Sequence, residues 1–298
     1  MTWTRQKERG SLAALRLMAW IVTRLGYRIG YALLYPIATY FFLSSPLQRQ
    51  AVRRFQRRAL GREPTRREVF RSFFVFSATL LDRLFLVDGK RHGYELRVVG
   101  LDLLNERIAR GQGCILLGAH LGSFEAMRAV ADTGCPVEVV ALMHQENAAN
   151  VASFFAEWGP RQAAAVIPLG RPDAMLRAKE CLERNGLVGI LADRTPGTGK
   201  VTRVPFLGTD AAFPLGPHIL AGVMDAPVMI AFGVWTGPRS YEVHFQPFAD
   251  RITIDRRDRQ AALDVIVRDY ASRFEDIARK FPYNWFNFYD FWEEFGTG

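Results

Sequence analysis

The segment from residue 118 to residue 125 holds the side chains best suited to chemistry in this 298-residue chain. It reads Gly-Ala-His-Leu-Gly-Ser-Phe-Glu, with His120 and Glu125 separated by a turn that Gly118 and Gly122 make possible. An imidazole that titrates near neutral pH can take a proton from a hydroxyl. A carboxylate on its other ring nitrogen would fix the tautomer and stabilise the imidazolium. We therefore predict His120 as a general base and Glu125 as its orienting carboxylate.

The same residues also fit a purely structural role. His120 could sit in a turn that caps a helix, and Glu125 could be an acid favoured by the helix dipole in the first turn. The spacing alone does not separate these interpretations. If the segment is catalytic, we expect Gly122 and Ser123 to contact the substrate, with backbone amides at residues 122–124 as candidates to stabilise an oxyanion.

Short apolar runs alternate with helical patterns from about residue 96 onward, which predicts an α/β fold with a mainly parallel sheet covered by helices. The predicted strands are residues 96–99, 114–117, 137–142, 166–169, 187–192, 228–234 and 241–245. The predicted helices are residues 65–90, 102–110, 125–132, about 151–158, 172–185, 215–224 and 257–280. His120 then follows a buried strand, at the sheet edge where ligands bind in open α/β sheets.

Two further segments could contribute to a site. Asp193 and Arg194 end the strand at residues 187–192, so we expect them at the same edge as His120, with Arg194 available to hold a phosphate. A structural ion pair between the two is the alternative. Phe206 and Gly208 belong to a turn that would line a slot for an acyl chain, and plain core packing is the alternative for them.

The N-terminal quarter differs from the rest in charge and hydropathy. Residues 1–67 contain 14 Lys and Arg but only 2 Asp and Glu, although the whole chain has a net charge of only +9. Residues 29–46 form an uncharged, aromatic-rich run of 18 residues between arginines. Such a run favours a helix or hairpin that dips into one leaflet, with basic arms on anionic headgroups. A buried core helix is the alternative. We predict a membrane-associating region at residues 1–90 and an α/β domain at residues 91–298.

Several other classes of protein are disfavoured. The arginines would also suit nucleic acid, but the adjacent apolar run favours a bilayer, so no nucleic-acid partner is expected. Residues 197–200 lack the flanking residues of a phosphate-binding loop, and Ser123 is not in a G-x-S-x-G elbow. The three cysteines form no C-x-x-C pair, and no metal-ligand spacing occurs, so no metal or other cofactor is expected.

The chain resembles the late lipid A acyltransferases, which transfer lauroyl or myristoyl groups, over most of its length. The resemblance rests on residues 118–127 (GAHLGSFEAM), 186–197 (GLVGILADRTPG), 204–221 (VPFLGTDAAFPLGPHILA) and 225–235 (DAPVMIAFGVW). It implies that His120 is the general base and Glu125 its partner. It also implies a fatty acyl thioester of acyl carrier protein or coenzyme A as co-substrate, a lipid or glycolipid hydroxyl as acceptor, and a location at the cytoplasmic face of a bacterial inner membrane.

The chain departs from that family near its end, where residues 283–292 (YNWFNFYDFW) are aromatic instead of basic. Because a basic site suits a bis-phosphorylated sugar, this difference leaves lipid A itself open as the acceptor. The tail is closer to a side branch linked with aryl-polyene lipids. A non-catalytic membrane-binding protein of the same fold and a thioesterase-like hydrolase are the alternative functions.

Overall fold

A seven-stranded sheet is the centre of the computed structural model, which describes residues 12–87, 93–134, 137–143, 154, 157, 166–194, 199–255 and 257–292. The strands follow the order β1-β9-β8-β2-β5-β3-β4. Their bounds are β1 Glu95–Val99, β2 Cys114–Gly118, β3 Val139–Met143, β4 Val166–Pro168, β5 Leu187–Leu191, β8 Val228–Gly237 and β9 Ser240–Ala249. All neighbours are parallel except the antiparallel pair β8 and β9. The predicted mainly parallel sheet is confirmed, and each predicted strand supplies one of its members.

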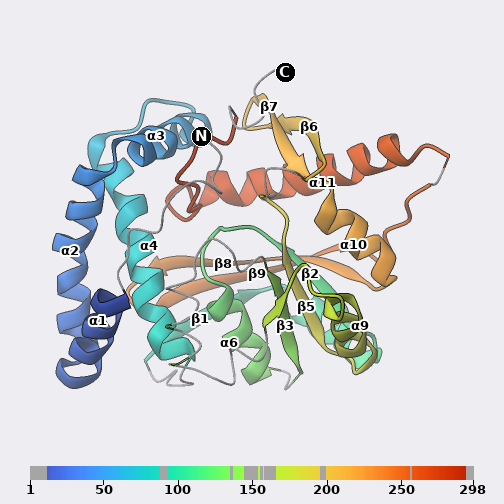
Figure 1. Cartoon of the computed structure of the whole chain (residues 1–298), viewed down its shortest axis with the longest axis horizontal. Helices are drawn as coiled ribbons and strands as arrows, with labels where there is room; N and C mark the ends of the chain where they lie inside the picture. Colours follow the sequence, from blue (N-terminus) through green and yellow to red (C-terminus); the bar gives the residue numbers. More distant parts are fainter. Residues whose placement is uncertain are drawn as a thin grey trace.

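Helices cover both faces of this sheet (Figure 1). They are α5 Leu101–Ala109, α6 Phe124–Gly134, α9 Ala174–Glu183, α10 Gly216–Met224 and α11 Arg259–Lys280. These five predicted helices are therefore confirmed in place, and so is the helix predicted at residues 65–90, which is α4 Arg66–Val87. The helix predicted around residues 151–158 falls largely outside the described residues.

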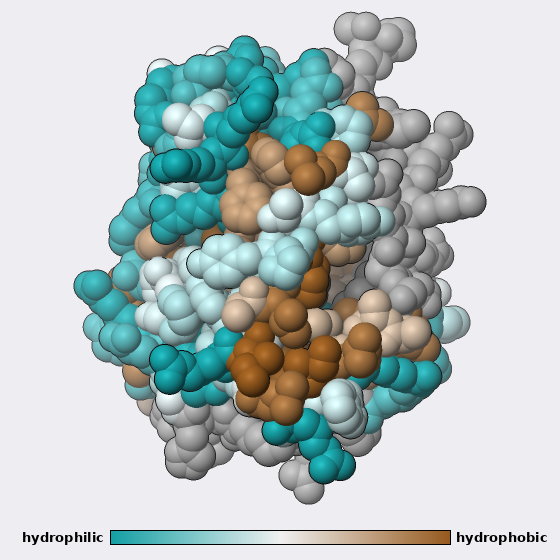
Figure 2. Space-filling view, turned by 90° about the vertical axis from the view of Figure 1, so that its left-hand side faces the viewer, coloured by the Kyte–Doolittle hydropathy of each residue, from teal (hydrophilic) through white to brown (hydrophobic). Residues whose placement is uncertain are grey.

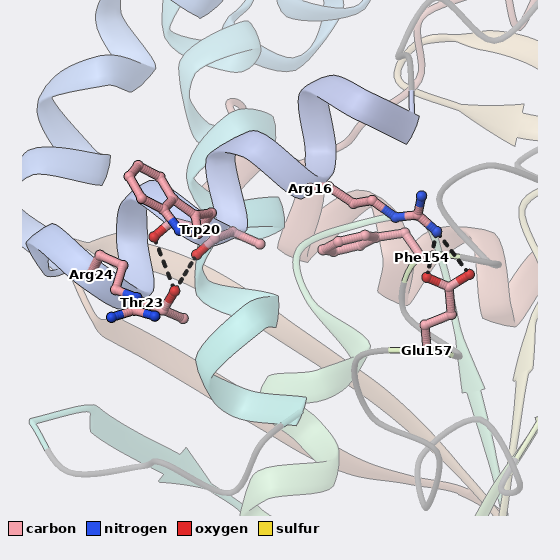
Figure 3. A pocket seen from close by; sticks show the side chains of 7 residues that line it. Arg16, Trp20, Thr23, Arg24, Phe154 and Glu157 are labelled. Carbon is pink, nitrogen blue, oxygen red and sulfur yellow. Dashed lines mark hydrogen bonds and ion pairs between the residues drawn. The ribbon is translucent and has the colours of Figure 1, made fainter.

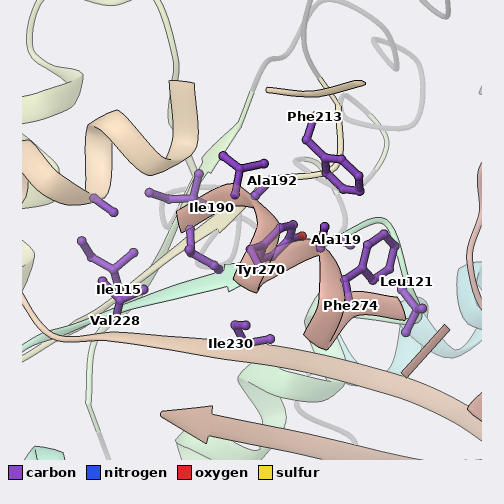
Figure 4. Packing of buried hydrophobic residues seen from close by; sticks show 14 of the residues in the cluster. Ile115, Ala119, Leu121, Ile190, Ala192, Phe213, Val228, Ile230, Tyr270 and Phe274 are labelled. Carbon is purple, nitrogen blue, oxygen red and sulfur yellow. The ribbon is translucent and has the colours of Figure 1, made fainter. Parts of the chain in front are cut away.

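Alternation along the strands divides the interior into two hydrophobic clusters, because successive strand side chains point to opposite faces. Ile115 and Leu117 of β2 pack in one cluster, whereas Leu116 packs in the other. In the first cluster, Tyr270 and Phe274 of α11 point toward the strand side chains (Figure 4). The Tyr270 hydroxyl also donates a hydrogen bond to the carbonyl at the end of β2, on Gly118, at 2.7 Å. This contact fixes the strand end from which the candidate site begins.

Four helices from the N-terminal part stand together at one end of the sheet (Figure 1). They are α1 Leu12–Leu25, α2 Tyr27–Ser44, α3 Pro46–Leu60 and α4 Arg66–Val87. Buried Asp82 of α4 ties this group to the sheet, because it accepts hydrogen bonds from Tyr94 (2.7 Å) and from Tyr241 of β9 (2.8 Å). Burial raises the pKa of Asp82 to about 6. The group is thus packed on the α/β body by both apolar and polar contacts.

The apolar run at residues 29–46 lies mostly in α2, which packs one side against α4 and exposes the other. Tyr31 packs edge-on against Phe74 of α4, whereas Tyr40 and Leu43 remain exposed. In the part of the chain that the structure covers, no helix is both long enough and apolar enough to cross a membrane. One side of the apolar run thus packs in the protein core, and the other side lies on the surface.

A two-stranded hairpin, β6 Val201–Phe206 and β7 Thr209–Pro214, stands apart from the main sheet and was not predicted. Its turn is made by Leu207 and Gly208, which have φ values of +52° and +84°. Pro205 and Pro214 lie within the two strands, and proline in a sequence argues against a strand. The hairpin tolerates them because, within the described residues, its two strands pair with each other and with no further strand.

Candidate active site

The register of β2 and β5 brings His120 and Asp193 together at one edge of the sheet. The two strands are parallel neighbours, and Gly118 of β2 stands opposite Leu191 of β5. His120 and Asp193 each lie two residues beyond these paired positions. The amide of Ala192 donates to the Gly118 carbonyl at 2.9 Å, so the pairing continues past the strand ends. The meeting of the two side chains therefore follows from the sheet itself.

Asp193 holds His120 through both of its carboxylate oxygens. Oδ1 lies 2.8 Å from Nδ1 of the imidazole, and Oδ2 accepts the backbone N–H of His120 at 3.1 Å. Oδ2 also accepts the indole N–H of Trp285 at 2.9 Å. Since the carboxylate is fully buried and these contacts stabilise it, it has a defined orientation.

The charges at this pair favour a neutral imidazole beside an ionised carboxylate. Burial, and next the nearby Arg194, lower the pKa of His120, and Asp193 opposes them only partly. Burial alone would raise the pKa of Asp193, but His120, Arg194 and Trp285 together keep it well below its usual range. An ionised Asp193 accepts a hydrogen bond from an N–H at Nδ1, which places the lone pair of the neutral ring on Nε2. The imidazole side chain is 34% exposed, and within the described residues no hydrogen bond occupies Nε2, so this nitrogen can meet a substrate hydroxyl.

Glu125 faces a different partner from the one predicted. Its Oε1 lies 2.6 Å from Nε of Arg83 on α4, and its Oε2 accepts a hydrogen bond from Ser123 Oγ at 3.4 Å. No hydrogen bond or ion pair joins Glu125 to His120 among the described residues. The reason is the sharp turn at Gly122 (φ +79°), after which α6 carries Glu125 toward α4. The carboxylate on His120 in this structure is thus Asp193.

The backbone amides proposed for an oxyanion are not equally available. The amide of Gly122 donates to the Asn284 carbonyl at 2.9 Å, and the amide of Ser123 donates to the Gly233 carbonyl at 2.7 Å. Ser123 Oγ caps α6 by accepting the Ala126 amide at 3.3 Å. Within the described residues, the amide of Phe124 at the start of α6 has no such acceptor. It is the remaining candidate of the three.

The side chain of Arg194 contacts the C-terminal segment of the protein. Its Nη2 donates to the Phe286 carbonyl at 2.6 Å, and its guanidinium lies over the ring of Tyr289. Its Nε is 3.9 Å from Asp193 Oδ2, which is a long ion pair. Arg194 therefore contributes positive charge beside the His120–Asp193 pair, which we call the dyad. A role of Arg194 in holding a phosphate stays a prediction.

The sequence model for bacterial lipid A biosynthesis acyltransferases matches residues 12–293. The chain belongs to this family. The comparison with curated proteins finds no match. Because this family consists of acyltransferases, the protein is an acyltransferase, and its reaction requires an acyl donor and a lipid acceptor.

Phe206 and Gly208, predicted to line an acyl slot in this lipid A acyltransferase family member, differ in their exposure. Phe206 is fully buried against Phe213, Phe274 and Trp285. Gly208 is exposed in the turn of the hairpin. The structure gives Phe206 a packing role, and contact of either residue with an acyl chain stays a prediction.

The site includes a segment that sequence reasoning did not find. Residues 284–286 run antiparallel to the turn after β2, with Trp285 paired to Leu121 in an isolated bridge. Phe286 N donates to the His120 carbonyl at 2.9 Å. The aromatic composition of the C-terminal segment was visible in the sequence, but its contact with residues more than 160 positions earlier had no local signal.

Two other features bear on ligand binding by this acyltransferase. A pocket of about 410 Å³ lies beside α1, where Arg16 is paired with Glu157 at 2.8 Å and Trp20 and Arg24 form another part of the wall (Figure 3). It does not include His120. Among the described residues, no cluster of three His, Cys, Asp or Glu side chains is arranged to hold a metal ion.

Proposed function

We propose that this acyltransferase transfers a fatty acyl chain from a thioester to a hydroxyl of a lipid or glycolipid, with His120 as the general base. The observation that carries this proposal is the hydrogen bond between His120 Nδ1 and the buried Asp193 carboxylate at 2.8 Å. It supports a neutral imidazole with a free Nε2 lone pair next to solvent. Such a group can accept a hydroxyl proton at neutral pH.

The proposed reaction is one direct displacement. Nε2 of His120 takes the proton of the acceptor hydroxyl while the oxygen attacks the thioester carbonyl. The tetrahedral intermediate carries its negative charge on the former carbonyl oxygen, toward which the Phe124 amide would donate. The carbon–sulfur bond then breaks, the proton passes from His120 to the leaving sulfur, and an ester and a thiol result. No acyl-enzyme forms.

We propose acyl carrier protein or coenzyme A as the carrier of the donor thioester, since the resemblance implies both. The resemblance also implies a lipid or glycolipid acceptor at the cytoplasmic face of a bacterial inner membrane. A phosphorylated acceptor would meet Arg194 beside the dyad. The aromatic residues around it favour an acceptor with less anionic charge than a bis-phosphorylated sugar.

The surface formed by α1 and α2 is the proposed membrane contact. Apolar side chains gather on this face of the molecule (Figure 2). The large exposed apolar residues of the two helices are Leu17, Trp20, Leu25, Ile29, Tyr35, Tyr40 and Leu43. Arg24 and Arg28 are exposed among them and suit anionic headgroups.

The arginines of α3 are less suited to that role than the sequence suggested. Arg53 and Arg57 both pair with Glu63, and Arg54 pairs with Asp290. The basic arm is thus partly neutralised within the protein. We therefore assign the headgroup contact to α1 and α2.

The test of this function is the identity of the product. Purified full-length protein is incubated with vesicles containing a candidate hydroxyl lipid and with acyl thioesters of carrier protein or of coenzyme A, and lipids are analysed by mass spectrometry. We expect an acylated lipid and a stoichiometric amount of free thiol. Free fatty acid that forms equally without acceptor would instead identify a thioesterase, and an absence of thioester consumption with every donor and acceptor tested would contradict transfer.

A further inference from the structure

Residues 284–286, which we call the C-terminal strap, connect the two halves of the candidate dyad. The strap exchanges two backbone hydrogen bonds with the turn that carries His120, from Phe286 N to the His120 carbonyl and from Gly122 N to the Asn284 carbonyl, both at 2.9 Å. It also reaches Asp193 through the Trp285 indole at 2.9 Å. One short segment therefore contacts both the residue proposed as base and its carboxylate.

The strap is itself fixed to the sheet. The side chain of Asn284 accepts the Trp235 amide at 2.7 Å and donates to the Trp235 carbonyl at 3.1 Å, which is the pairing that a further β-strand would make. Asn284 is buried and Trp285 is almost completely buried. The position of the indole is consequently set by β8 and by the core, and the substrate is not required to order it.

The hydrogen bond from Trp285 is more than a consequence of burying a large ring. Trp292 packs in the same aromatic group, 6.4 Å from Trp285 between ring centroids. Its indole nitrogen is buried without a hydrogen-bond partner in the described structure. The group thus accepts an indole whose N–H is unused, whereas the N–H of Trp285 is directed at the one carboxylate that holds His120.

We propose that Trp285 is a positioning residue of the acyltransferase, whose indole N–H fixes the Asp193 carboxylate so that Oδ1 holds the imidazole with Nε2 toward the acceptor hydroxyl. Asp193 has to bind His120 through both oxygens, to Nδ1 and to the backbone N–H. The indole N–H is the third donor to the carboxylate and the second on Oδ2, and it restricts rotation of the carboxylate. It also withdraws negative charge from Oδ1, which limits how strongly the imidazole retains a proton. This inference rests on the proposed role of His120.

The test replaces the indole with a ring of the same shape that lacks the donor. β-(3-Benzothienyl)alanine incorporated at position 285 has sulfur in place of the N–H, and Trp285→Phe is the simpler genetic variant. Trp292→Phe is the matched control, because it removes the same atoms from the same aromatic group but no hydrogen bond. Two quantities are measured: steady-state acyl transfer, and the pKa of His120 from NMR titration of histidine-labelled protein.

We expect both position-285 variants to lose about tenfold in kcat, with KM for the thioester changed less than twofold. We also expect the His120 pKa to rise, because a carboxylate with one donor fewer stabilises the imidazolium more strongly. Trp292→Phe should change neither quantity. Position-285 variants that match Trp292→Phe in kcat and in the His120 pKa would overturn the inference.

The NMR measurement separates this inference from the proposed function. The His120 pKa reports the Trp285–Asp193 contact whether or not acyl transfer is observed. A shifted pKa in a protein that transfers no acyl chain would uphold the positioning contact and contradict the function. If the wild-type enzyme is active and the position-285 variants leave the His120 pKa unshifted, the positioning role alone is contradicted.

Discussion

At the scale of single residues, the chemistry was predicted more fully than its geometry. His120 and Asp193 were both expected at the same sheet edge, and both lie there. Their direct contact was not expected, because it depends on which strand neighbours β2 and in which register. Glu125 was predicted as the partner of His120 instead of Asp193 because it is closer to His120 in the sequence. A contact across neighbouring strands leaves no spacing signal in one chain, whereas a turn-and-helix motif does.

Mutagenesis can test whether Asp193 or Glu125 is the carboxylate on which the activity of His120 depends. Asp193→Asn is expected to reduce kcat/KM by at least about a hundredfold, because an amide in place of a carboxylate favours the wrong tautomer of its histidine. Glu125→Gln should cost less, since it weakens the ion pair with Arg83 and leaves Nδ1 bonded. Kinetics with one donor and one acceptor would measure both variants. The reverse ranking would mean that Glu125 contacts the imidazole in the working enzyme.

The protonation of His120 predicts the acid side of the pH profile. Burial and the charge of Arg194 lower the pKa of the imidazole below its ordinary value of 6.5. Because only the neutral ring accepts a proton, kcat/KM should be constant near pH 7 and should fall only as the pH drops through this lowered pKa. The profile of kcat/KM from pH 5 to pH 8 would show it. An acid limb centred above pH 6.5 would contradict the described electrostatics.

At the scale of elements, the main sheet was readable because its buried strands are continuous apolar runs between turn signals. The hairpin of β6 and β7 was missed because its strands contain Pro205 and Pro214, which the sequence presents as loop signals. The C-terminal strap was missed for another reason. Its pairing with the His120 turn has no periodicity and joins segments far apart in the chain. Both omissions concern structures that only tertiary contacts define.

The turn between β2 and α6 gives a prediction at this scale. Gly122 has a φ of +79°, and a Cβ there would lie 2.0 Å from the Gly233 carbonyl oxygen. Gly122→Ala should therefore lower the free energy of unfolding by more than about 2 kcal/mol, through strain and a forced shift of β8. Gly61 has a similar φ of +66° with open space around it. Gly61→Ala is the control, with an expected cost of about 1 kcal/mol; equal losses in urea unfolding would refute the close contact.

At the scale of the whole molecule, the N-terminal helices α1 and α2 carry many of the large apolar side chains that are exposed in the described structure. The sequence predicted an apolar and basic region there, but not how much of it the protein would cover itself. Packing of α2 on α4 buries part of the aromatic run, and acidic residues neutralise part of the basic arm. That division depends on tertiary packing. What remains exposed is concentrated on α1 and α2.

Vesicle binding tests this surface. Leu17 and Leu25 are 57% and 55% exposed on α1, and replacing both by serine should weaken binding to anionic vesicles at least about tenfold, because each leucine forfeits its burial in lipid. Val223 and Val265 are 69% and 65% exposed on α10 and α11, away from this face. The double variant Val223→Ser with Val265→Ser is the matched control. Co-sedimentation that responds equally to both pairs would contradict the assigned face.

The central claim, that His120 held by Asp193 is the base for acyl transfer, is tested most directly by His120→Ala. Transfer from an acyl thioester to a lipid hydroxyl should be measured at pH 7 with wild-type and variant protein of equal unfolding free energy and equal vesicle binding. We predict that the variant loses at least about a hundredfold in kcat while KM for the thioester stays within a few-fold. Undiminished turnover in His120→Ala would contradict the mechanism.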